Sequence, residues 1–366
     1  MSIVTRAELW QRLQAQALVD GELPPQRNTQ SPWYVRVMLG VAGWIGAMFL
    51  LGFVGAVFAA VTHSAAAALV VGIGCCTGAF LVFRAARDND FGAQFGLAAS
   101  LAGQALIAYG IFSAFRQESS AVFFLICLVE IALAVLMPNF IHRVLSSWAA
   151  MIAFFLGLTM LHLHGIAPGI AGAGVACIWL NEARWIARDA MWRPTGYGLT
   201  LALLQVDAMP LLHGLGWSPS SADNGWLYLH ASQVGTALVA LVLLATVTRL
   251  LSRQGYAAGS GIGIASFAAT AALVAVSFFA PGLATALLVL LLGFAAGNRV
   301  LMGLGLLALG GFLAHYYYQL QQTLLVKSMV LAVSGALLLC ARAVLKQWLG
   351  PITGIEPALR EGDIHA

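Results

Sequence analysis

Long apolar runs separated by short polar segments dominate the sequence. The runs are about 17 to 25 residues long, which is the length that a helix needs to cross roughly 30 Å of hydrocarbon. They lack the alternation of apolar and polar residues that is typical of barrel strands. The pattern predicts an all-α, polytopic integral membrane helical bundle of about twelve transmembrane helices. We place the spans at 37–61, 65–84, 92–114, 120–137, 145–163, 166–181, 196–213, 229–249, 261–280, 282–297, 300–317 and 325–345.

The first 36 residues form the longest polar stretch of the chain. Thr5 and Glu8 have the spacing of a capping box that opens a helix, and Asp20-Gly21 closes it. Apolar residues recur at helical spacing between them, so one face can lie on the bilayer surface or on the bundle. The predicted organisation is a cytoplasmic amphipathic helix and linker at 1–36, a transmembrane bundle at 37–345 and a short cytoplasmic tail at 346–366.

Composition excludes an ordinary soluble globule. Charged residues make up 9% of the chain and apolar and aromatic residues 61%, whereas about a quarter of a soluble domain is charged. The net charge of +4 is small and the arginines are scattered among loops, so no nucleic-acid surface is indicated.

The placement of basic residues predicts the orientation of the chain. With the N-terminus in the cytoplasm, all but two of the 18 lysines and arginines fall on the cytoplasmic side. The two on the opposite side are Arg116 and Lys327. This asymmetry follows the positive-inside rule and places the N-terminus and the C-terminus both in the cytoplasm.

An internal repeat is indicated by three similar span starts. Residues 95–97, 197–199 and 302–304 read Phe-Gly-Leu, Tyr-Gly-Leu and Met-Gly-Leu. They suggest three parallel four-helix repeats at 37–140, 141–255 and 256–345, an arrangement common in transporter folds. The alternative is that glycine-leucine matches arise readily in apolar sequence.

The segment between the last two predicted spans carries the most distinctive polar residues. His315, Tyr316, Tyr317 and Tyr318 are followed by Lys327 and Ser328, all expected at the outer face. Adjacent tyrosines place hydroxyl groups toward protein and toward the headgroups. Lys327 can extend to the interface, pair with a carboxylate or contribute to a substrate or ion site.

At these residues the chain resembles bacterial inner-membrane proteins of the domain of unknown function 4401. The resemblance rests on Tyr316-Tyr317-Tyr318, Leu324-Leu325, Lys327-Ser328 and Ser334-Gly335-Ala336. It implies a multi-pass protein of the bacterial inner membrane and brings no biochemical activity. It also implies a partner, since such proteins are commonly encoded beside a small membrane-anchored protein with a GDYxxLxY motif.

Two acids lie within predicted spans. Glu130 falls near the middle of the fourth span and Asp207 in the second half of the seventh. A carboxylate there must be paired, hydrated or protonated, so each is either a proton-carrying group or a packing contact between helices.

The chain carries no nucleophile elbow, HExxH motif or phosphate-binding loop. Its five cysteines lie in apolar stretches without CxxC spacing, and we expect no catalytic residues, cofactor or metal. The leading hypothesis is a noncatalytic subunit or scaffold of a membrane complex that binds lipid and a small anchored partner. A secondary transporter or flippase is the alternative, and a membrane-embedded enzyme is third.

Overall fold

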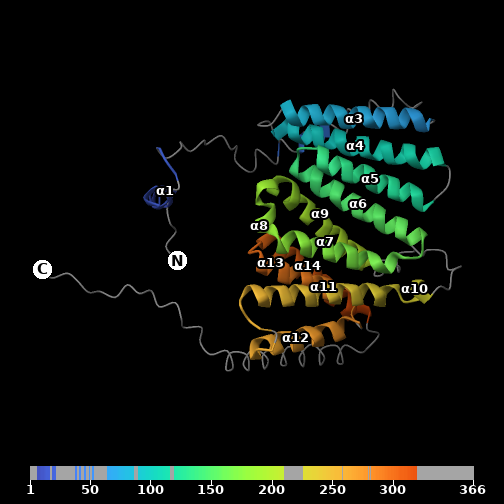
Figure 1. Cartoon of the computed structure of the whole chain (residues 1–366). Coiled ribbons are helices and arrows are strands. Elements are labelled where there is room, and N and C mark those ends of the chain that lie inside the picture. The colour runs from blue at the N-terminus through green and yellow to red at the C-terminus, as the bar shows by residue number, and fades with distance from the viewer. Residues whose placement is uncertain are drawn as a thin grey trace. The chain divides into compact units, whose positions relative to one another are not determined.

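In the part of the chain that the structure describes, all regular secondary structure is helical and no strand occurs (Figure 1). This computed structural model describes residues 6–16, 19–21, 64–85, 90–115, 119–209, 226–257, 259–278, 280 and 282–319, with single residues at 38, 41, 42, 45, 46, 49 and 52. The chain divides into two compact units. The first comprises residues 1–116 and 137–139, and the second comprises 117–136 and 140–366.

The first unit contains α1 (Arg6–Ala15), α3 (Ala65–Ala85) and α4 (Asp90–Phe115). Helices α3 and α4 lie side by side (Figure 1). A Cβ atom on Gly72 would lie 2.8 Å from the carbonyl oxygen of Gly103, so glycines let the two backbones approach this closely. Helix α1 lies within the predicted N-terminal segment, and Gly21 after it adopts a positive φ of 96°.

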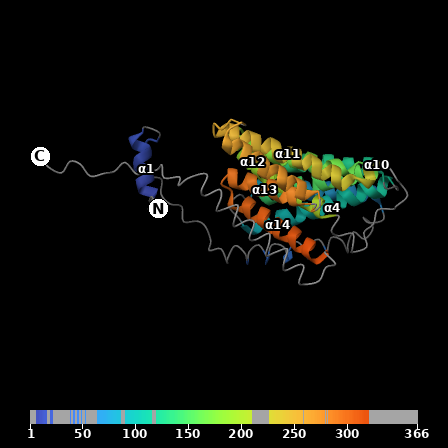
Figure 2. The same ribbon diagram turned by 90° about the horizontal axis from the view of Figure 1, so that it is seen from below.

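The second unit is a bundle of helices that pack along one another. Its elements are α5 (Ser120–Leu136), α6 (Phe140–Met160), η2 (His164–Ile166), α7 (Ala167–Leu180), α8 (Glu182–Trp185), η3 (Ile186–Arg188), α9 (Asp189–Ala208), α10 (Trp226–Leu229), α11 (Ala231–Arg253), α12 (Gly261–Ser277), α13 (Leu283–Ala295) and α14 (Arg299–Gln319). The pairs α5–α6 and α6–α9 pack side by side, and α13 and α14 form a hairpin (Figure 2).

The core of the second unit lies between α6, α7, α9, α11, α13 and α14. Val175, Leu203, Leu288, Val289 and Leu301 are fully buried there. Large apolar side chains also cover the outside of the helices, where Leu128 and Leu241 are more than 60% exposed. An apolar exterior around an apolar core is typical of a bundle whose solvent is lipid.

Five described helices are long and apolar enough to cross a membrane, namely Ala65–Ala85, Phe91–Phe115, Phe140–Met160, Ala231–Arg253 and Arg299–Tyr317. The segments His164–Leu180 and Glu182–Ala208 qualify together, although they meet at an angle of 74°. Three shorter apolar helices, α5, α12 and α13, accompany them.

Each predicted span from 65–84 to 300–317 overlaps a helix of the described chain. The predicted span 325–345 and most of 37–61 lie outside the described residues. The boundary between the two units falls inside the first predicted repeat. The all-α membrane class is therefore confirmed, while the count of twelve spans and the threefold repeat stay predictions.

Candidate functional site

A buried polar cluster joins α5 to α6. Glu130 of α5 is 5% exposed, and His142 and Ser146 of α6 are fully buried. Ser146 hydrogen-bonds the Glu130 carboxyl group, and its Oγ lies 3.4 Å from Nδ1 of His142. A hydroxyl has one proton, so a Ser146 that donates to Glu130 accepts from the Nδ1–H tautomer of His142.

Two polar atoms of this region lack a hydrogen-bond partner among the described residues. They are Oε2 of Glu130 and Oγ of Ser147. A buried polar group without a partner costs about 1–3 kcal/mol, so each such atom in a folded protein requires an explanation.

Arg143 connects the end of α5 to the start of α9. Its Nε donates to the carbonyl oxygen of Ala134 at 3.1 Å, and its two terminal nitrogens donate to Val135 at 3.4 Å and Ala190 at 2.6 Å. The last carbonyl groups of a helix have no partner within the helix and carry partial negative charge. Arg143 therefore satisfies the last turn of α5 and fixes it against α9.

A cavity of about 370 Å³ lies beside this cluster. Cys127 and Ile131 of α5, Ser147 of α6, Ile170 of α7 and Trp192 of α9 are among the residues that line it. Its walls are almost entirely apolar, and its size is within the range of about 300–1,000 Å³ that ligand cavities occupy.

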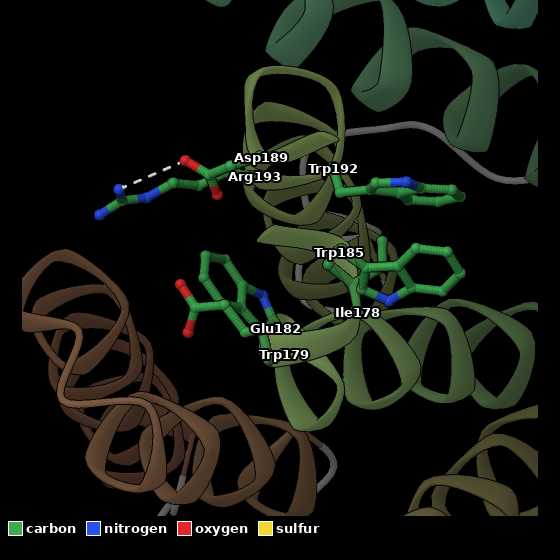
Figure 3. Close-up of a pocket in the computed structure, with 7 residues that line it drawn as sticks. All are labelled: Ile178, Trp179, Glu182, Trp185, Asp189, Trp192 and Arg193. Atoms are coloured by element: carbon green, nitrogen blue, oxygen red, sulfur yellow. Dashed lines mark ion pairs between the residues drawn. The ribbon is translucent and has the colours of Figure 1, made fainter. Parts of the chain in front are cut away.

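A second, much smaller cavity of about 10 Å³ lies where α7, α8 and α9 meet (Figure 3). Trp179, Trp185 and Trp192 line it, and Trp185 and Trp192 lie close together with ring centroids 4.6 Å apart. Arg193 and Asp189, drawn in the same view, form an ion pair at 3.9 Å. A volume of this size holds at most about one water molecule, so the feature is a packing defect at a bend and not a ligand site.

Asp207 contacts a different helix from Glu130. Its carboxylate accepts a hydrogen bond from the buried Thr285 of α13. Two residues earlier on α9, Gln205 accepts a hydrogen bond of 2.8 Å from the indole of Trp148 on α6. Neither Glu130 nor Asp207 is among the residues that line the two cavities described above. Both acids thus bond hydroxyl groups of neighbouring helices.

The distinctive segment at the end of α14 is described only in part. His315, Tyr316 and Tyr317 are half-buried in the last turns of the helix. The side chain of Tyr318 and the whole of Lys327 and Ser328 lie outside the described residues. The structure therefore leaves the predicted site at this segment untested.

Arginines gather at one end of the second unit. Arg249 of α11 donates to Oδ1 of Asn181 at 2.8 Å, and Arg253 donates to the carbonyl oxygen of Leu180. At the same end, Asn298 donates to the hydroxyl group of Tyr197 at 2.7 Å. The described part of this unit contains no lysine, and its seven arginines all lie at or near helix ends on this side of the bundle. They are Arg143, Arg184, Arg188, Arg193, Arg249, Arg253 and Arg299.

A family model described as Domain of unknown function (DUF4401) matches residues 32–348, which is most of the chain. The chain belongs to the DUF4401 family. The resemblance inferred from the sequence is thereby confirmed. No curated protein and no solved structure matches this DUF4401 chain.

The sequence reasoning on this DUF4401 chain missed His142, Arg143 and Ser146. The signal that was available is the i, i+4 spacing of His142 and Ser146, which places two polar side chains on one face of a helix. Ser146 lies between a histidine and a carboxyl group, but it is fully buried between two helices. Its bonds therefore join α5 to α6.

Proposed function

We propose that this DUF4401 protein is a noncatalytic subunit of a membrane complex that holds a small membrane-anchored partner in the bacterial inner membrane. The observation that supports the proposal most is the way its buried polar groups are used. Glu130 with Ser146, Asp207 with Thr285 and Gln205 with Trp148 each connect two helices. Such bonds make a fixed framework, which suits a scaffold.

The proposed arrangement in the membrane has about twelve spans and both termini in the cytoplasm. Support comes from the gathering of seven arginines at one end of the second unit. The proposed partner is a small anchored protein with a GDYxxLxY motif, and its contact surface is the segment that carries Tyr316, Tyr317, Tyr318, Lys327 and Ser328. Tyrosine rings and a lysine at the headgroup level can pack against, and hydrogen-bond to, a neighbouring helix.

A secondary transporter or flippase is the second candidate. The unpartnered Oε2 of Glu130 favours it, because carboxyl groups inside membranes often move protons. Against it, Glu130 and Asp207 bond to different helices and neither lines a described cavity. We therefore favour assembly over transport.

Affinity purification from the native host tests the proposal. Tagged wild-type protein is expected to recover a small partner in stoichiometric amount, and Tyr317→Ala and Lys327→Ala are each expected to lose it. Tyr256→Ala is the matched control, since Tyr256 is an exposed tyrosine that follows α11 at the arginine-bearing end. Size-exclusion chromatography establishes that each variant stays folded. Recovery of no stoichiometric partner by the wild type, or equal recovery by all variants, would contradict the proposal.

A further inference from the structure

The 370 Å³ cavity between α5, α6, α7 and α9 is open to the outside of the bundle. Ile131 and Val135, which line it, are each 48% exposed, and Ile170 is 46% exposed. In a membrane protein such an opening faces hydrocarbon, so the cavity is filled by lipid or by another protein.

The lining of the cavity decides between these occupants. Its walls are almost entirely apolar, which suits an acyl chain that is flexible enough to fill an irregular opening. The polar groups next to the cavity suit a lipid headgroup.

A cationic side chain, that of Arg143, bonds to residues that line the cavity. Arg143 donates hydrogen bonds to the carbonyl groups of Ala134 and Val135, which line the cavity, and of Ala190, which precedes the lining residue Met191. These bonds hold the guanidinium group beside residues that line the cavity. Arg143 has no carboxylate partner within the described part of the chain. A guanidinium group has five N–H donors, so two remain for an anion.

The face of α6 that borders the cavity changes from polar to apolar along its length. Arg143 is followed one turn later by Ser147, and then by Ala150, Met151 and Phe154. Ser147 lines the cavity and is 5% exposed, and its buried hydroxyl group has no hydrogen-bond partner among the described residues. A helix rises about 6 Å over four residues, so Ser147 lies about 6 Å beyond Arg143 along α6. In a phospholipid the ester carbonyl groups follow the phosphate in the same order.

We propose that this cavity binds one anionic phospholipid, with its phosphate at Arg143, an ester carbonyl at Ser147 and an acyl chain against Met151 and Phe154. The site requires neither the small anchored partner nor any transport. It gives the framework one resident lipid at its arginine-bearing end.

Native mass spectrometry of the full chain in detergent, with phosphatidylglycerol or phosphatidylcholine of the same chain length, tests the proposal. One phosphatidylglycerol is expected to bind about fivefold more tightly than phosphatidylcholine, the effect of one arginine on an anionic lipid. Ile131→Trp fills the mouth of the cavity and is expected to abolish this binding. Leu128→Trp is the matched control, since Leu128 lies on the same helix, is 64% exposed and does not line the cavity.

Ser147→Ala is expected to weaken phosphatidylglycerol binding two- to tenfold, the effect of one hydrogen bond. A photoreactive acyl chain on phosphatidylglycerol is expected to crosslink to α5, α6 and α9 at the cavity in the wild type. Equal binding of the two lipids, equal loss in both tryptophan variants, or crosslinks spread evenly over the lipid-facing surface would each overturn the proposal. A photoreactive amino acid placed at Ile131 that captures a protein and no lipid would overturn the proposal as well.

Discussion

The wall of the cavity depends on how closely α9 approaches α6 at Gly198. A Cβ atom on Gly198 would meet the carbonyl oxygen of Val144 and would lie 2.8 Å from Cβ of Ser147 and 3.0 Å from the backbone nitrogen of Trp148. Two of these atoms belong to the backbone of α6, which cannot rotate away as a side chain can. Gly198→Ala must therefore push the helices apart.

The expected cost follows from two opposing effects. Alanine in place of glycine stabilises a helix by up to about 1 kcal/mol, whereas overpacking a tight interior typically costs about 1–3 kcal/mol. Gly172→Ala separates the two effects. Gly172 is a buried glycine of α7, and a Cβ there would lie no closer than 3.5 Å to a neighbouring side chain. The helix gain is shared by both variants, so Gly198→Ala should be less stable than Gly172→Ala by about 1–3 kcal/mol.

This difference is measured by titrating the full chain in detergent micelles with denaturant and recording unfolding by tryptophan fluorescence. Gly172→Ala is expected to unfold at or above the wild-type midpoint and Gly198→Ala below it. Midpoints that coincide for the two variants would refute the close approach of α6 and α9.

Two further predictions concern buried hydroxyl groups and orientation. Thr285→Val removes a hydrogen-bond donor to Asp207 and is expected to lower the free energy of unfolding by about 1–3 kcal/mol. The control is Thr246→Val, at a buried threonine that bonds the backbone of its own helix at 2.8 Å, and it is expected to change stability little in the same assay. Equal losses in the two variants would contradict the contact with Asp207. In a cysteine-free background, a membrane-impermeant maleimide is expected to label Leu161→Cys in intact cells. It is expected to label Ala187→Cys only after the membrane is permeabilised. The reverse pattern would contradict the proposed orientation.

Hydropathy predicted most of the described helices because each apolar run forms one helix with its hydrogen bonds inside it. The predicted boundaries fail where tertiary contacts satisfy polar residues. Helix α6 begins at Phe140, five residues before the predicted span, since His142 is buried and Arg143 bonds the end of α5. Helix α9 begins at Asp189 and continues through Pro194, although the polar stretch before residue 196 indicated a loop.

The two acids of the candidate site were identifiable from sequence, because a carboxyl group in an apolar run is rare. Their partners were not. The contacts of Glu130 with Ser146 and of Asp207 with Thr285 depend on which helices become neighbours, and the second of these pairs is separated by 78 residues. The cavity was also beyond sequence reasoning, since it results from four helices meeting imperfectly.

The arginines at the end of the second unit have two duties at once. As charges they favour one side of the membrane, and as hydrogen-bond donors Arg143 and Arg253 complete the last turns of α5 and α7. At Arg143 the bonds come from three nitrogens of one planar guanidinium group, so a lysine there would preserve the charge and lose this arrangement. Exchange between arginine and lysine should consequently be rarer at Arg143 than at an exposed arginine such as Arg184 of α8.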